Sequence, residues 1–97
     1  MTLRVPTHGC PAIGCTKRVP NHLLLCLQHW RRVPRPLQAA IYAAHRRLAA
    51  ASEEEYARDP GRQLNVLSAV KAIADKEGVA IPDWLTSRLS KLEGARA

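Results

Sequence analysis

The sequence predicts a small, mainly α-helical protein that begins with a treble-clef-like zinc finger, a short hairpin plus a helix, followed by about three helices. Four Cys and His side chains fall in two pairs within the first thirty residues, and the remainder repeats apolar residues at helical spacing. The chain has only 97 residues and no Phe, so it can bury only a modest core. A structural metal would supply stability that such a core lacks.

The first pair is Cys10 with Cys15, and the second pair is Cys26 with His29. Pro11 and Gly14 mark a turn between the first two cysteines, and Gly14 can take the positive φ that such a turn often needs. Cys26 and His29 are three residues apart, so on the first turn of a helix they share one face.

Three Cys and one His are the ligands of a tetrahedral structural zinc site. Cys10, Cys15, Cys26 and His29 are therefore the predicted ligands of one zinc ion, with His22 and His8 as alternatives to His29. Four protein ligands leave no open position for water or substrate, and no Glu accompanies them in an H-x-E pattern. The site is therefore expected to be structural and the protein not to be an enzyme.

Between the two pairs, residues 17–25 are predicted to form a short hairpin that turns at Pro20-Asn21. A helix carries Cys26 and His29, and the basic stretch Trp30-Arg31-Arg32 then follows and ends at Val33-Pro34. Turn, hairpin and helix follow one another as in a treble-clef finger, and this module spans residues 1–35.

Residues 36–93 are predicted to form a helical hairpin or small bundle that shares one core with the finger. The first helix runs over residues 36–58, with Pro36 in its first turn. Ser52 and Glu55 could form a capping box and break this helix. We favour continuity, because Glu54 and Arg58 then form an i,i+4 pair. The apolar stripe of this helix comprises Leu37, Ile41, Ala44, Leu48 and Ala51.

Asp59-Pro60-Gly61 is expected to end the first helix, and a second helix follows over residues 62–77 with Gly78 as its stop. A third helix begins at Pro82 and runs to about residue 92, and residues 94–97 are expected to fray. The side chains predicted to face inward are Leu64, Leu67, Val70, Ile73 and Ala74 from the second helix, and Trp84, Leu85, Leu89 and Leu92 from the third.

Charge is distributed unevenly along the chain. Residues 1–52 hold eight Lys and Arg and no carboxylate, whereas residues 53–97 hold seven Lys and Arg and eight carboxylates. The first part therefore carries the whole positive excess of a chain whose net charge is +7. No apolar run is long enough to cross a membrane. The start of the sequence lacks the apolar stretch of a signal peptide, and three Cys cannot all pair within one chain, so a cytoplasmic protein with reduced thiols is expected.

The stretch C-P-A-I-G-C, followed by L-L-L-C-L-Q-H-W-R-R-V-P, resembles a group of small Cys/His zinc-finger-like proteins encoded by actinobacterial phages. The shared features are a Cys pair, a Cys-x2-His-Trp step, and Val-Pro before a helix, and they cover residues 10–45. The resemblance implies a zinc-bound fold and a phage source. Most such proteins have no assigned function, so the resemblance implies little about activity.

These observations predict a zinc-stabilised binding protein, an adaptor or effector that engages an acidic host protein in the host cytoplasm through its basic finger face. The alternative is a regulatory protein that binds DNA or RNA through backbone contacts. The helical part could also support a homodimer. The predicted contact residues are Lys17, Arg18, Trp30, Arg31, Arg32, Arg35, Arg46 and Arg47.

Overall fold

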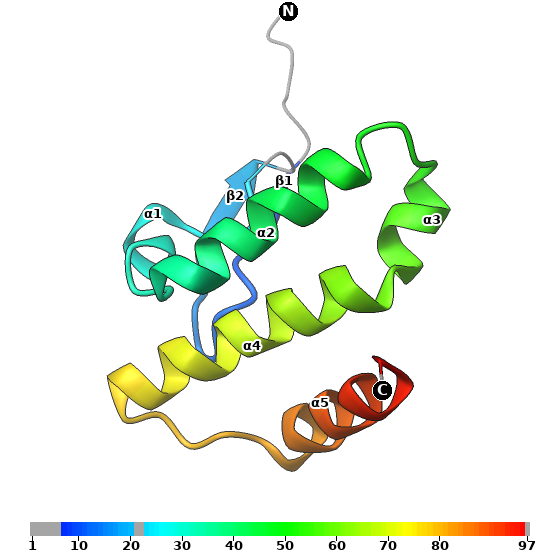
Figure 1. Ribbon diagram of the computed structural model, residues 1–97. Coiled ribbons are helices and arrows are strands. Elements are labelled where there is room, and N and C mark those ends of the chain that lie inside the picture. The colour runs from blue at the N-terminus through cyan, green and yellow to red at the C-terminus, as the bar shows by residue number, and fades with distance from the viewer. Residues whose placement is uncertain (1–6, 21–22, 97) are drawn as a thin grey trace, which may run out of the picture.

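The computed structural model describes residues 7–20 and 23–96 and confirms the predicted fold class (Figure 1). A short two-stranded hairpin and a Cys/His cluster precede a helical remainder. The elements are β1 (Thr7–Gly9), β2 (Arg18–Pro20), α1 (Leu27–Trp30), α2 (Arg35–Arg47), α3 (Glu53–Arg58), α4 (Pro60–Glu77) and α5 (Asp83–Arg96).

The hairpin lies earlier in the chain than predicted. β1 pairs with β2 in antiparallel register, with His8 opposite Val19, so the first Cys pair lies in the loop between the strands. The expected hairpin over 17–25 is wrong, because β2 finds its partner before Cys10 and residues 23–25 form no strand. The Leu23 N–H does donate to the Pro20 carbonyl at 2.9 Å, but Asn21 and His22 lie outside the described residues.

The predicted continuous helix over 36–58 is also wrong, since α2 ends at Arg47 and α3 begins at Glu53. The Ser52 hydroxyl accepts a hydrogen bond from the Glu55 N–H at 3.1 Å and so caps α3. The pair between Glu54 and Arg58 forms within the short helix, at 2.6 Å, and needs no longer one. The break lets the chain turn back so that α4 runs antiparallel to α2 (Figure 1).

Asp59-Pro60-Gly61 starts a helix as well as ending one. The Asp59 carboxylate accepts from the Arg62 N–H at 2.8 Å, and Pro60 occupies the first turn of α4. α4 therefore begins two residues before the predicted position. Gly78 ends it with φ 68°, the left-handed conformation expected of a glycine C-cap.

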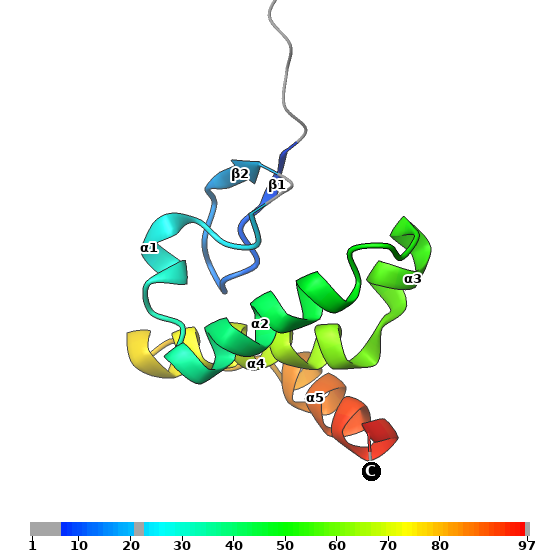
Figure 2. The same cartoon turned by 45° about the horizontal axis from the view of Figure 1, so that its top comes forward.

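α4 is the central helix, and it contacts α2, α3 and α5 (Figure 2). One face packs against the finger, and Ile73 there is 0% exposed. The other face packs against α5, where Leu85 is equally buried. The finger cluster consists of Cys10, Ala12, Val19, Leu25, Cys26, Val33, Ala69 and Ile73, with Cys15, Leu24, Trp30, Leu37 and Ile41 packed around it.

α5 departs from the prediction in two ways. Leu85, Leu89 and Leu92 are buried as expected, but Trp84 is 60% exposed. Residues 85, 89 and 92 follow the helical period, and Trp84 precedes that stripe by one position, about 100° around the helix. Helix α5 also continues through Arg96, so residues 94–96, expected to fray, are helical. Within the described part of the chain, no helix is long and apolar enough to span a bilayer.

Candidate metal centre

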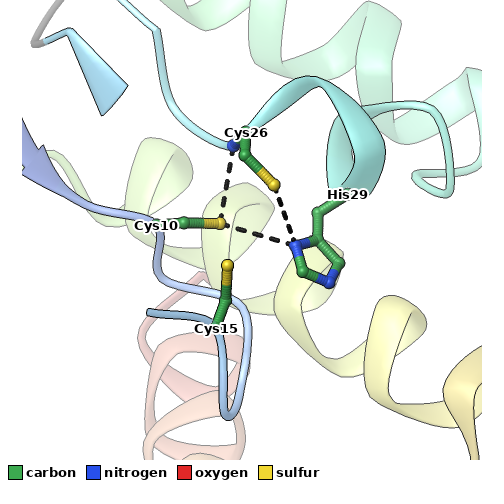
Figure 3. Close-up of side chains that lie close together, drawn as sticks. All are labelled: Cys10, Cys15, Cys26 and His29. Atoms are coloured by element: carbon green, nitrogen blue, oxygen red, sulfur yellow. Dashed lines mark hydrogen bonds between the residues drawn. The ribbon is translucent and has the colours of Figure 1, made fainter. Parts of the chain in front are cut away.

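The four predicted ligands come together from two segments (Figure 3). Cys10 and Cys15 project from the loop between β1 and β2, Cys26 precedes the first residue of α1, and His29 lies on α1. Their ligand atoms all lie within 4.8 Å of one another. Cys10, Cys26 and His29 are buried and Cys15 is half-buried, so the cluster is largely shielded from solvent.

Local backbone bonds shape the first half of the cluster. The Cys10 N–H donates to the Lys17 carbonyl at 2.9 Å and the Cys15 N–H to the Ala12 carbonyl at 3.0 Å. Gly14 has φ 79°, and a Cβ built there would meet nothing within 4 Å. The turn therefore needs glycine for its backbone conformation and not for space, as the sequence suggested.

The cluster is compact enough to surround one metal ion, and the distances expected for zinc offer a comparison. With bonds of about 2.3 Å to sulfur and about 2.0 Å to nitrogen, two sulfur ligands would be about 3.8 Å apart and a sulfur and a nitrogen about 3.5 Å apart. His29 Nδ1 lies 3.1 Å from Cys26 Sγ and 3.7 Å from Cys10 Sγ. The Cys26 N–H also donates to Cys10 Sγ at 3.5 Å, a contact that favours a thiolate. The cluster therefore has the geometry of a metal site.

The environment acts differently on two of the thiols. Burial raises the pKa of Cys26, but hydrogen bonds from the backbone and ring of His29 outweigh it and lower that pKa from 9.0 to about 7. At Cys10, burial dominates and raises the thiol pKa. The lowered pKa brings Cys26 close to losing its proton near neutral pH, and the resulting thiolate is the form that binds a metal ion.

The alternative histidine ligands are resolved in part. His8 lies outside the cluster, and its ring N–H donates to the Leu24 carbonyl at 3.1 Å. His22 lies outside the described residues. Of the histidines that the structure describes, His29 is the one that joins the three cysteines.

Sequence reasoning missed one residue at this site, Glu77. Its Oε1 lies 2.9 Å from His29 Nε2, and it comes from the last turn of α4. The neighbouring Lys76 donates its ammonium to the Arg32 carbonyl at 2.7 Å. No sequence signal connects Glu77 with a ligand 48 positions earlier, because only the packing of α4 against the finger brings them together.

Several of the predicted contact residues are engaged within the fold. Lys17 donates to Gln28, Arg18 to Thr7, and Arg47 forms a two-pronged pair with Asp59 at 2.8 and 3.1 Å. Arg32 is half-buried, and its Nη1 has no hydrogen-bond partner among the described residues. The exposed arginines whose side chains form no hydrogen bond or ion pair with the described residues are Arg31, Arg35 and Arg46.

Trp30 is half-buried and meets Tyr42 edge-on, with ring centroids 5.4 Å apart. Tyr42 is 52% exposed, and sequence reasoning did not single it out. The sequence feature that could have identified Tyr42 is its spacing, seven residues after Arg35 and four before Arg46, which places all three on one face of α2.

Comparisons add no relative: no family model, curated protein or solved structure matches this chain. Its function must therefore be argued from the Cys/His cluster and the exposed surfaces.

Proposed function

We propose that this protein is a non-enzymatic binding protein folded around one structural zinc ion, and that it contacts the phosphate backbone of nucleic acid through α2. The observation that carries the metal assignment is the convergence of Cys10, Cys15, Cys26 and His29. The binding assignment is supported by the unpaired arginines that flank Tyr42 on one helix face.

Zinc is favoured by the chemistry of the ligands. Three thiol sulfurs and one imidazole nitrogen suit a borderline-soft ion without redox chemistry, and Ca²⁺ or Mg²⁺ would require oxygen ligands. The four protein side chains would fill all tetrahedral positions and leave none for a reacting water. The ion would instead join the hairpin to α1, two short elements that have little core of their own.

Cobalt substitution tests the ligand set directly. Co²⁺ in a tetrahedral site with three thiolates gives intense visible bands and sulfur-to-metal charge transfer, whereas octahedral Co²⁺ absorbs weakly. The wild-type protein is expected to show the tetrahedral spectrum, and Cys15→Ser to weaken its charge-transfer band. Thr16→Ser, at the exposed neighbouring position, serves as the control and is expected to leave the spectrum unchanged. An octahedral spectrum in the wild-type protein would refute the assignment.

The exposed face of α2 has the composition of a surface that binds phosphates. At about 100° per residue, Arg35, Tyr42 and Arg46 fall within about 40° of one another around the helix, and the two arginines are about 16 Å apart along it. No carboxylate occurs in α2, and Arg31 lies just before it. The arginines on either side of Tyr42 would contact phosphates, and its exposed ring would stack on a base. Proteins that bind single strands without sequence preference combine these two contacts.

Binding to single-stranded DNA of arbitrary sequence tests this surface. Replacing Arg31, Arg35 and Arg46 by Ala together is expected to reduce the slope of log affinity against log salt by about 2–3. Tyr42→Ala is expected to weaken binding about 5- to 150-fold, the range for loss of one stacked base. A control with Arg58, Arg88 and Lys91 changed to Ala removes equal charge from other helices. Absence of affinity at low salt, or equal loss in the control, would refute the proposal.

A protein adaptor is the second candidate. Two large apolar side chains favour it, because Leu27 on α1 is 63% exposed and Trp84 on α5 is 60% exposed. An adaptor would capture a host protein in nuclease-treated lysate and lose it on Leu27→Ser or Trp84→Ser. Capture that disappears with nuclease treatment would favour the nucleic-acid surface instead.

A further inference from the structure

We propose that Glu77 is a positioning residue of the zinc site, one that fixes the tautomer and orientation of His29 and makes α4 part of the metal centre. The inference rests on the proposed zinc site and extends it to a residue from the other half of the chain. Glu77 would not bind the ion itself, since its contact is with the nitrogen of His29 that faces away from the sulfurs.

The two ring nitrogens of His29 face different partners. Nδ1 points to the sulfurs, at 3.1 Å from Cys26 Sγ and 3.7 Å from Cys10 Sγ (Figure 3). Nε2 lies 2.9 Å from the Glu77 carboxylate. A neutral imidazole carries one N–H, and an ionised carboxylate can only accept. Once zinc replaces the Nδ1 proton that faces Cys26, the remaining proton therefore belongs on Nε2, and the lone pair of Nδ1 is directed at the metal position.

Partial burial and the position at the end of α4 strengthen the hydrogen bond between His29 and Glu77. The His29 side chain is 10% exposed and that of Glu77 is 30% exposed, so water competes only in part for the hydrogen bond. A carboxylate in the last turn of a helix is disfavoured by the helix dipole, and the imidazole N–H offsets that cost. Lys76 holds the adjacent Arg32 carbonyl, so the end of α4 contacts the finger at two successive residues.

The contact between Glu77 and His29 couples metal binding to the packing of α4 against the finger. A carboxylate that accepts from a metal-bound imidazole raises the basicity of the ring and holds its plane, so it strengthens the metal bond. By linkage, the metal then stabilises the contact between α1 and α4. Zinc would thus hold the finger onto the helical hairpin as well as closing the finger itself.

Competition for zinc against a chelator of known affinity, at fixed pH, tests the role of Glu77. Glu77→Ala is expected to lower zinc affinity about 10- to 100-fold, the range for loss of such a partner. Glu77→Gln is expected to lose less, because its amide oxygen still accepts the N–H. The matched control is Asp75→Ala, which removes an exposed carboxylate from the same helix end and is expected to leave affinity unchanged.

Nitrogen NMR of His29 in the zinc-loaded protein gives a readout that a merely structural role would not move. Wild-type protein is expected to show zinc at Nδ1 and a slowly exchanging proton on Nε2, and Glu77→Ala to exchange that proton faster. Should Glu77→Ala fail to fold, Glu77→Gln carries the test. Zinc at Nε2, or affinities of both Glu77 variants equal to that of Asp75→Ala, would overturn the inference and leave the zinc site standing. A wild-type chain that binds no zinc would overturn both.

Discussion

Truncation of Ile73 tests whether the finger and the helices share one core. Ile73 lies on α4, is 0% exposed, and packs in the cluster that contains Cys10 and Cys26. Ile73→Ala removes three carbon groups, which at about 0.8 kcal/mol each gives about 2.4 kcal/mol of lost burial. A residual cavity adds about 1–2 kcal/mol, so we expect a loss of about 3–4 kcal/mol in the free energy of unfolding.

Urea unfolding at a fixed free zinc concentration measures this loss. Ile73→Val should cost about 0.5–1.5 kcal/mol and so grade the effect. Val79→Ala, at a 37% exposed position just beyond α4, is the control and should cost less than Ile73→Val. Leu85→Ala, equally buried but in the cluster with α5, should destabilise the fold to a similar degree while weakening zinc binding less. A cost below about 1 kcal/mol for Ile73→Ala would refute the shared core.

Three further predictions concern local structure. Gly14→Ala should lower the free energy of unfolding by about 1–2 kcal/mol, because the residue has a left-handed φ of 79°. Gly94→Ala should raise it by about 0.5–1 kcal/mol, because alanine stabilises a helix relative to glycine. The thermal unfolding midpoints of the two variants should therefore shift in opposite directions. Ser52→Ala should cost about 1 kcal/mol and speed hydrogen exchange in α3. The side-chain hydrogen bond from Arg47, and then the backbone N–H of Arg62, lower the pKa of Asp59 from 3.8 to about 2. Because the folded pKa lies below the unfolded one, the stabilisation is present above about pH 4 and is lost as pH falls through 2; Arg47→Ala should raise this pKa in a carboxyl NMR titration.

The metal cluster was predictable because its information is local. Each ligand pair lies within six residues of sequence, and a tight turn or one helical turn brings its members together. Gly14, Gly78 and the buried stripe of α5 followed for the same reason. Backbone geometry and helical period determine these features without reference to the rest of the chain.

The errors arose where a local signal allowed two outcomes. Ser52 and Glu55 could cap a new helix, or Glu54 and Arg58 could support one longer helix. The exposed ion pair contributes less stability than the packing of α4 against α2, which requires the chain to turn back. Strand pairing is a contact between segments, so β2 gave no sign of whether its partner preceded or followed it. The contact of Glu77 with His29 could not be predicted from the sequence, because only tertiary packing brings the two residues together.

Metal content and folding, measured together, test the central claim most directly. Protein purified without added chelator should contain one zinc ion per chain by elemental analysis. Removal of that ion by a chelator should abolish most of the helical circular dichroism or lower the unfolding midpoint sharply, because binding free energy at such sites is folding free energy. A metal-free chain with unchanged circular dichroism and an unchanged unfolding midpoint would contradict the account.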